Sequence, residues 1–276
     1  MGRVQGKVAL ITGGARGQGR SHAVRLAEEG ADIIVLDALT EQPFQPASGS
    51  TEEDLEETVR LVEKTGQRIF ARQADVRDFD QVKSVVDEGV AELGRLDIVS
   101  ANAGITGLPS KSEDIPEEAW TSMLDINLTG VWRTYKAAIP HIRAGGRGGS
   151  IILTSSSMGL HAAANLGHYI AAKHGVVGIM RSLAVELAPE SIRVNSIHPT
   201  TVDTDMIRNE STYRLFRPDL ADPKQEDMVE AASGYNKMPI PWIEAIDISN
   251  AVLWLASDEA RYVTGVPLPV DAGAIL

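Results

Sequence analysis

Short apolar runs rich in β-branched residues recur along the chain, and longer stretches of mixed apolar and polar residues separate them. Such runs are typical of buried strands, while the stretches between them have the apolar spacing of amphipathic helices. Regular alternation of the two predicts a parallel sheet covered by helices on both faces. We therefore predict an α/β fold, a single Rossmann-type, doubly wound domain over residues 1–276. Its seven strands are expected near 7–12, 32–37, 68–72, 96–101, 149–154, 192–197 and 266–270.

The clearest helical pattern occupies residues 169–187. A helix there would place two residues that are four positions apart on the same face. A second helix is expected over 51–64, and Ser50 followed by Glu53 indicates a capping box at its start. The apolar residues of the first pattern are Val176, Val177, Ile179, Met180, Leu183 and Leu187.

Two segments break the alternation of strand and helix. Residues 38–51, ALTEQPFQPASGST, contain two prolines, a glycine and several serines, a composition that predicts an irregular loop. Residues 205–242 are long and mixed in character, and a stretch of that kind over a ligand cleft usually acts as a lid. This lid is expected to line the cleft with Met206, Tyr213, Phe216 and Trp242.

Composition narrows the classes of protein that the pattern allows. The 276 residues contain no cysteine, which excludes disulfides, thiolate catalysis and cysteine-ligated metal sites. A formal net charge of −12 without a basic stripe argues against a nucleic-acid partner. The apolar run near the start, Val8–Ile11, is too short for a signal peptide, and no run approaches the length of a membrane span. We expect a cytoplasmic protein that contacts no membrane.

Candidate chemistry lies in the run HYIAAKHG, where Tyr169 and Lys173 are four residues apart. Ser156 precedes Tyr169 by thirteen residues and follows an apolar, strand-like run. A phenol has an ordinary pKa of about 10, and a neighbouring ammonium group favours its ionised form. Lys173 would thereby make Tyr169 a usable general acid or base, with Ser156 as a hydrogen-bond donor to the reacting oxygen.

The N-terminal strand leads into the glycine-dense sequence GGARGQG and then into a helical pattern. Glycines at this joint allow positive φ angles, and the start of a helix favours a pyrophosphate. Asp37 ends the second expected strand, twenty residues after Gly17. An acid there can accept hydrogen bonds from both ribose hydroxyls of NAD and repels the 2′-phosphate of NADP. Arg16 is the one conflicting feature, since a cation could meet that phosphate.

Ligands of such sheets collect at the carboxyl ends of the strands. The candidate residues all follow expected strand ends, so we predict that they converge on one site. They are the glycine loop, Asp37, Asp75-Val76, Asn102-Ala103-Gly104, Ser156 and His198-Pro199.

These motifs together resemble the short-chain dehydrogenase/reductases along nearly the whole chain. The resemblance rests on TGGARGQG, on ANAG at 101–104, on Asn127, on the Ser156, Tyr169 and Lys173 set, and on HPTTVDT at 198–204. It is strongest to the mycofactocin-associated, carveol-dehydrogenase-like branch, through GQGRSHAVRLAEEGADII, RQADVRD and the extra segment after Asp37. His198 and Thr200 depart from the N-P-G pattern of the family, which puts the local backbone there in doubt.

The resemblance implies reversible oxidation of a secondary alcohol to a ketone with NAD. In the family, the position of Asn127 kinks its helix and holds a water that relays protons to the lysine. The implied catalytic residues are Asn127, Ser156, Tyr169 and Lys173. The implied cofactor-binding residues are Gly13, Ala15, Arg16, Gly17, Gln18, Gly19, Asp37, Asp75, Val76, Asn102, Ala103, Gly104, Tyr169, Lys173, Pro199, Val202 and Thr204.

Further expectations follow from the branch that the chain resembles. The substrate is expected to be an apolar alcohol or ketone, cyclic or terpenoid-like. An insertion such as 38–51 is linked there to a nicotinamide cofactor that stays bound between turnovers, with a mycofactocin-type electron acceptor. The family usually forms homotetramers, and the apolar C-terminal run YVTGVPLPVDAGAIL suits a subunit contact.

Three other interpretations deserve comparison. A 3-oxoacyl-[acyl-carrier-protein] reductase would share the catalytic set, but Asp37 and the acidic chain count against its usual NADPH and acidic carrier. A non-catalytic nucleotide-sensing protein has no need of that set. His161, His168 and His174 cluster in sequence, but their spacing matches no compact metal motif, so we expect no metal and place His161 or His168 beside the substrate or in solvent.

Overall fold

The computed structural model describes residues 2–276 and contains one seven-stranded, entirely parallel sheet. Every expected strand is present, with ends within two residues of the prediction. The predicted fold class is therefore confirmed. The strands are β1 (Val8–Thr12), β2 (Asp32–Asp37), β3 (Ile69–Gln73), β4 (Ile98–Ala101), β5 (Gly149–Thr154), β6 (Ile192–Pro199) and β7 (Pro267–Val270).

The spatial order of the strands is β3-β2-β1-β4-β5-β6-β7. The chain runs outward from β1 to β3, returns to the other side of β1 as β4, and then continues outward to β7. Between β1 and β4 the strand order therefore reverses, and loops on the two sides of this point diverge at the carboxyl edge. Such a switch point opens a crevice for a ligand in doubly wound sheets.

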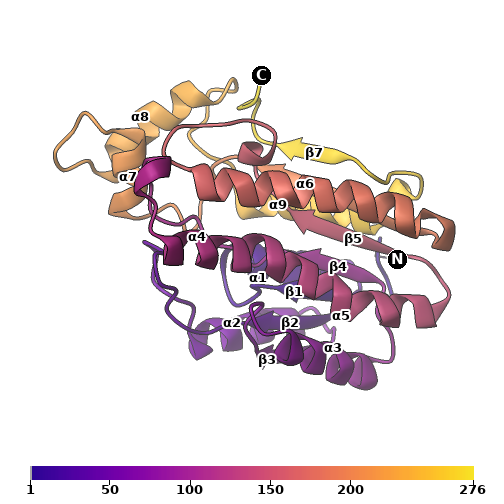
Figure 1. The fold of residues 1–276 in the computed structure, drawn as a ribbon. Coiled ribbons are helices and arrows are strands. Elements are labelled where there is room, and N and C mark those ends of the chain that lie inside the picture. The colour runs from indigo at the N-terminus through magenta and orange to yellow at the C-terminus, as the bar shows by residue number, and fades with distance from the viewer. Residues whose placement is uncertain (1) are drawn as a thin grey trace.

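Helices cover both faces of the sheet (Figure 1). On one face α3, α5 and α6 pack over the largest group of buried apolar side chains, and on the other α1 and α9 pack over a second group. The helices are α1 (Gly17–Glu28), α2 (Glu52–Glu63), α3 (Phe79–Leu93), α4 (Glu117–Leu124), α5 (Gly130–Gly145), α6 (Gly167–Leu187), α7 (Glu210–Phe216), α8 (Gln225–Tyr235) and α9 (Ala245–Ala256).

The segment after β6 forms two short helices, α7 and α8, which pack against each other and project beyond the carboxyl edge of the sheet (Figure 1). The mixed sequence of 205–242 did not reveal these helices. The chain returns to the sheet through a bridge between Val202 and Ile243 before α9 begins. The two lid helices thus stand over the strand ends where the candidate site residues lie.

The start of α2 corrects one prediction. The capping box is made by Thr51 and Asp54, one residue later than expected, because the Thr51 side chain accepts a hydrogen bond from the Asp54 backbone and the Asp54 side chain accepts one from that of Thr51. Ser50 is left free for another role, a hydrogen bond to Asp37.

Candidate active site

Ser156, Tyr169 and Lys173 line one cavity, as their spacing predicts. Ser156 follows β5 and caps the short 3₁₀ turn η3 (Ser157–Gly159), accepting a hydrogen bond from Met158 N at 3.2 Å. Tyr169 and Lys173 lie one turn apart on α6, and the Lys173 ammonium nitrogen is 5.6 Å from the centre of the Tyr169 ring. Lys173 Nζ also donates to the Thr154 carbonyl at 3.0 Å, which ties α6 to the end of β5.

The electrostatics of this group differ from the expectation. Burial raises the pKa of Tyr169, and hydrogen bonding by the Ser156 hydroxyl lowers it only in part. Burial also lowers the pKa of Lys173 from 10.5 to about 8, because desolvation disfavours its charged form. The prediction that Lys173 lowers the tyrosine pKa is wrong, since burial raises this pKa and the opposing contribution comes from Ser156.

Asn127 lies in η2 (Asp125–Thr129), a π-helical turn that joins α4 to α5. Its side chain is fully buried and contacts neither large cavity. The amide exchanges two hydrogen bonds with the backbone of Ile105, at 2.8 and 2.7 Å. A Cβ atom added to Gly104 would lie 3.1 Å from Asn127 Oδ1 and 3.6 Å from Lys173 Nζ, so Gly104 separates the two polar groups. The Asn127 side chain therefore holds the exit of β4 beside the lysine.

The loop between β1 and α1 presents backbone N–H groups to a second pocket. Gly13 and Gly17 have φ angles of 68° and 55°, a region that favours glycine. The carbonyls of Gly14 and Ala15 are turned towards α2, where they accept hydrogen bonds from Thr58 Oγ1 at 3.0 and 2.9 Å. No side chain caps the start of α1, so its first N–H groups remain available to an anion.

Three acidic residues line this pocket, and two of them, Asp37 and Asp75, have different partners. Asp37 accepts a hydrogen bond from Ala15 N at 3.0 Å and from the Ser50 hydroxyl at 2.6 Å, so it joins the glycine loop to the segment after β2. Burial raises the pKa of Asp75, but the hydrogen bonds and the charge of Arg77 together lower this pKa by more, so the net direction is downward. Both carboxylates border the pocket, and both are held by hydrogen bonds from neighbouring residues.

Asn102 fixes the crevice between β1 and β4. Its backbone N–H donates to Thr12 Oγ1 at 3.1 Å, and its side-chain amide donates to the Thr12 carbonyl at 3.1 Å. The N–H of Ala103 donates to the same hydroxyl. Asn102, Ala103, Gly104 and Val76 all line the pocket beside the glycine loop, which brings these predicted residues to one edge.

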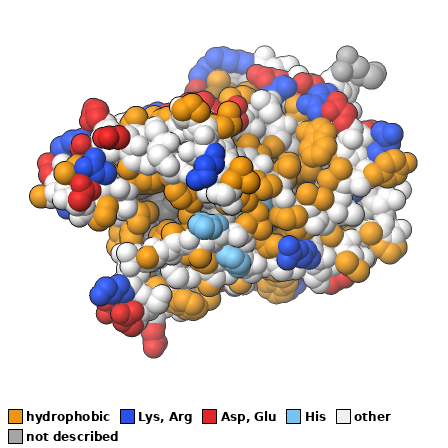
Figure 2. All heavy atoms as spheres, turned by 90° about the horizontal axis from the view of Figure 1, so that it is seen from above, with side chains coloured by type: hydrophobic (Ala, Val, Ile, Leu, Met, Phe, Trp, Pro, Cys, Tyr) orange, Lys and Arg blue, Asp and Glu red, His pale blue; other side chains and the backbone are white. Residues whose placement is uncertain are grey.

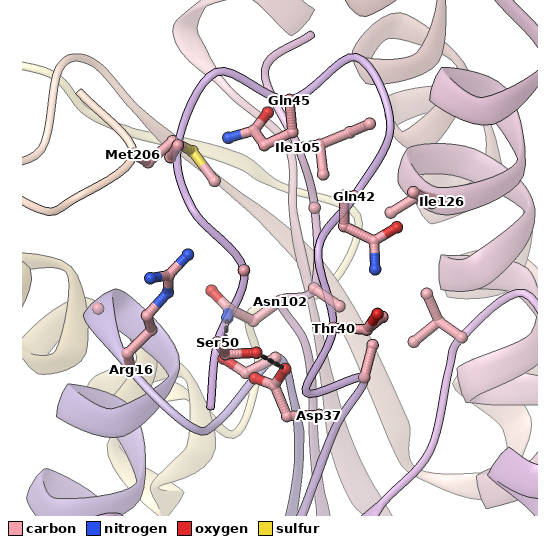
Figure 3. Close-up of a pocket in the computed structure, with 18 of the residues that line it drawn as sticks. Arg16, Asp37, Thr40, Gln42, Gln45, Ser50, Asn102, Ile105, Ile126 and Met206 are labelled. Atoms are coloured by element: carbon pink, nitrogen blue, oxygen red, sulfur yellow. Dashed lines mark hydrogen bonds between the residues drawn. The ribbon is translucent and has the colours of Figure 1, made fainter. Parts of the chain in front are cut away.

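Residues 38–51 form the irregular loop that their composition predicts, and the loop closes over this pocket, leaving a volume of about 180 Å³. Gln45 Oε1 accepts hydrogen bonds from Thr106 N at 2.9 Å and Gly107 N at 3.2 Å, which fastens the loop to the segment after β4. Figure 3 shows the loop above the pocket, with Gln42 and Gln45 on it and the bond between Ser50 and Asp37 at its base.

Arg16 does not remain free to meet a phosphate. Its guanidinium group donates to the carbonyl of Ser48 and lies 3.8 Å from the carboxylate of Asp205. Arg16 thus connects the glycine loop, the loop 38–51 and the start of the lid segment. These contacts give it a structural role that its position in the sequence did not indicate.

The cavity around Tyr169 has a volume of about 660 Å³, and residues of the lid segment form part of its wall. Figure 2 shows it as a hollow bordered largely by hydrophobic side chains. Met206 and Phe216 line it as predicted, but Tyr213 and Trp242 do not. Residues shared with the glycine-loop pocket are Gln18, Asn102, Gly104, Ile105, Thr204 and Met206, so the two cavities adjoin.

Of the sequence HPTTVDT, His198 and Pro199 end β6, and the chain bends irregularly from 200 to 204. Thr200 takes no positive φ angle, so the position does not require the glycine of the family pattern. His198 is fully buried, with Nδ1 2.7 Å from the Ser156 carbonyl oxygen and Nε2 2.8 Å from the Ser196 hydroxyl. Burial lowers its pKa to about 4, so the imidazole is neutral, and it supports the loop that carries Ser156. Pro199, Val202 and Thr204 line the large cavity.

The remaining histidines do not form a site. His161 is exposed, as expected, but His168 is buried, lines neither cavity, and has a pKa lowered by burial. Within residues 2–276 no three metal-binding side chains gather. In the same range, no helix has both the length and the apolar character needed to cross a membrane.

Comparison with known proteins agrees with this geometry. The family model for the short chain dehydrogenases matches residues 7–214. The chain belongs to the short-chain dehydrogenase family. It is 57% identical to the (−)-trans-carveol dehydrogenase of Rhodococcus erythropolis over all 276 residues, which is the full length of both chains.

Two solved structures extend the likeness to three dimensions. One is the carveol dehydrogenase of Mycobacterium avium in complex with NAD, with a TM-score of 0.98, 58% identity, and coverage of 100% of this chain and 99% of that one. The other is a short chain dehydrogenase of Mycobacterium paratuberculosis bound to NAD, with a TM-score of 0.90, 46% identity, and coverage of 99% of each chain.

The sequence pattern does not indicate several residues that line this short-chain dehydrogenase site. Gln42, Gln45 and Ser48 lie in a segment whose composition predicts only an irregular loop, and nothing in their spacing indicates which way that loop turns. The apolar lining from Leu215 and Ala231 requires the lid helices, whose short patterns were not recognised. The helical spacing of apolar residues in 225–235 is the signal that could have indicated α8, and with it the lining by Ala231.

Proposed function

We propose that this short-chain dehydrogenase interconverts a secondary alcohol and its ketone with NAD as the hydride carrier. The observation that carries the proposal is the meeting of Ser156, Tyr169 and Lys173 in a cavity that adjoins the glycine-loop pocket. A proton acceptor and a dinucleotide site side by side are what alcohol oxidation by hydride transfer requires.

The residues of the glycine-loop pocket fit NAD. Asp37 is placed for the adenosine ribose, the first turn of α1 for the pyrophosphate, and Lys173 for the nicotinamide ribose. Two buried amide oxygens in the pocket lining, Gln18 Oε1 and Gln42 Oε1, have no hydrogen-bond partner in the described structure and can accept from such a ligand. When bound, NAD would supply the nicotinamide carbon that takes the hydride.

The protein's own groups would orient the alcohol and move its proton. Ser156 donates a hydrogen bond to the substrate oxygen, and Tyr169 accepts the hydroxyl proton as the carbon–hydrogen bond breaks. The charge of Lys173, whose ammonium nitrogen is 5.6 Å from the centre of the Tyr169 ring, would favour the phenolate against the burial that raises the tyrosine pKa. In the reverse direction Tyr169 returns the proton to the carbonyl oxygen. The lid excludes water from this exchange.

An apolar, cyclic, terpenoid-like substrate is the class we propose. The lid lines the cavity with Ile207, Leu215 and Phe216, and the volume of about 660 Å³ accommodates a ring. Two of the similar proteins are named for carveol, a cyclic terpenoid alcohol. The homotetramer and the mycofactocin-type electron acceptor remain predictions of the resemblance.

Replacement of Asp37 by Asn tests the cofactor preference. Asn keeps a carbonyl oxygen for Ala15 N and an amide beside Ser50, but it loses the charge that repels a 2′-phosphate. We expect kcat/KM for NADP relative to NAD to rise about tenfold, which corresponds to about 1.4 kcal/mol. Asp37→Ala is the comparison, since it also frees Ser50. An unchanged ratio in Asp37→Asn would show that Asp37 does not discriminate between the cofactors.

Shortening residues 40–50 tests whether the loop retains NAD. The loop covers the pocket and must open before the dinucleotide leaves, so we expect a faster cofactor off-rate in stopped-flow release. Gln45→Ala should reproduce part of the effect because it removes the hydrogen bonds to Thr106 and Gly107. Gln67→Ala is the matched control, because Gln67 lies just before the amino end of β3, whereas the loop leaves the carboxyl end of β2. Equal off-rates in all proteins would reduce the loop to a surface insertion.

A further inference from the structure

One of the hydroxyl groups that the lid brings to the cavity wall has no hydrogen-bond partner within the described residues. Tyr235 is the last residue of α8, and it lines the large cavity together with Ser157. Its Oη atom is buried and makes no hydrogen bond of ordinary geometry within the described residues. A buried phenol normally finds a partner, because leaving a polar group unpaired costs free energy. The missing partner is therefore informative.

The side chains around Tyr235 indicate which polar group lies beside its hydroxyl. Burial raises the pKa of Tyr235, and the nearby Ser157 hydroxyl works in the opposite direction. Asp271 also acts on the phenol by its charge, but its carboxylate is engaged by Gly273 N at 3.0 Å and Ile275 N at 3.3 Å. Ser157 is thus the cavity-lining side chain whose hydroxyl lies beside the phenol.

Ser157 immediately follows Ser156 in the chain, and both line the same cavity. A small molecule whose reacting oxygen lies at Ser156 and Tyr169 can therefore also reach Ser157 and Tyr235. Most other lid residues of the wall are apolar, namely Met206, Ile207, Leu215, Phe216 and Ala231. Ser211 and Thr212 also bring hydroxyl groups to the wall, and that of Thr212 donates to Asn209 Oδ1 at 3.2 Å. A few polar groups set in a mostly apolar wall are how such a site selects a particular functional group.

We propose that Tyr235 and Ser157 form a second polar subsite that binds a further oxygen atom of the substrate. The preferred substrates would be cyclic secondary alcohols or ketones that carry a second hydroxyl or carbonyl group. The Tyr235 hydroxyl donates to this oxygen, and Ser157 donates to it or accepts from it. This inference rests on the proposed alcohol oxidation and specifies its substrate class.

The test compares cyclohexanol with the positional isomers of cyclohexanediol in the NAD-loaded protein. We expect kcat/KM for the best diol to exceed that for cyclohexanol at least about tenfold in the wild type, which corresponds to one hydrogen bond of about 1.4 kcal/mol. Tyr235→Phe should remove this preference and leave cyclohexanol turnover unchanged. A diol has two carbinol carbons that can react, which raises its kcat/KM in every variant by the same factor. Comparing the diol-to-cyclohexanol ratio of kcat/KM between variants removes this factor.

Two further variants keep the result interpretable. Ser157→Ala should lower the diol preference independently of the lid, and Tyr213→Phe removes a phenol hydroxyl from α7 outside the cavity lining and should change nothing. The subsite would be overturned if all three proteins, the wild type, Tyr235→Phe and Ser157→Ala, turned over cyclohexanol and had the same ratio of kcat/KM for diol to kcat/KM for cyclohexanol. That result would leave the proposed function intact. No turnover of either alcohol by the wild type would contradict both.

Discussion

Replacement of Tyr169 by Phe is expected to lower kcat about 10²–10⁴-fold, the range for loss of a general acid–base group. The substitution removes the phenol oxygen that accepts the alcohol proton in the proposed mechanism, but it keeps the ring, which packs against the buried core. Cofactor affinity should stay near the wild-type value, because the ring volume and Lys173 are retained. Steady-state turnover and equilibrium titration with NAD measure the two quantities separately.

Ser156→Ala is the companion variant, since it removes the other hydroxyl that the proposed mechanism places on the substrate oxygen. We expect a smaller loss of kcat, because Tyr169 still takes the proton. Retention of more than a tenth of wild-type kcat in Tyr169→Phe would defeat the assignment of Tyr169 as the acid–base group.

Lys173→Met is expected to lower kcat about a hundredfold and, in addition, to change how stability depends on pH. The lysine is 4% exposed, and burial lowers its pKa from 10.5 to about 8. In the unfolded chain the pKa returns to its ordinary value, so between pH 8 and 10.5 the unfolded state binds more protons than the folded state. By linkage the free energy of unfolding then rises with pH across that window.

The size of this effect follows from the difference between the two pKa values, at 1.36 kcal/mol for each pKa unit. Below pH 8 the buried ammonium group destabilises the cofactor-free protein by roughly 3 kcal/mol, and above pH 10.5 the penalty is gone. Urea denaturation of the wild type and of Lys173→Met across this range isolates the lysine, because other titrating groups are common to both. Parallel stability curves would contradict a buried, destabilised Lys173.

The sheet and its order of motifs were predictable because their signals are local. Buried parallel strands such as β2 are continuous apolar runs, and glycines such as Gly13 mark a turn that other residues adopt poorly. The rule that ligands collect at strand ends then brought Asp37, Asn102 and Ser156 together without any tertiary information.

The rest depends on contacts between distant segments. Gln45 fastens its loop to Thr106 and Gly107, which lie more than sixty residues further along the chain, and no local pattern encodes that meeting. The Ser50 capping prediction failed because Asp37, thirteen residues earlier, engages the Ser50 hydroxyl. The pKa of Tyr169 was predicted in the wrong direction because spacing identifies a neighbouring charge but not the depth of burial.

A single-turnover measurement tests the central claim most directly. Protein saturated with NAD is mixed with carveol that carries deuterium at the carbinol carbon, and reduced nicotinamide is followed by fluorescence and then identified by mass. The proposed function predicts one equivalent of deuterated NADH with the corresponding ketone, a rate slowed relative to unlabelled carveol, and almost no product from Tyr169→Phe. Unlabelled NADH, or no reduction while both ligands are bound, would contradict alcohol oxidation by hydride transfer at this site.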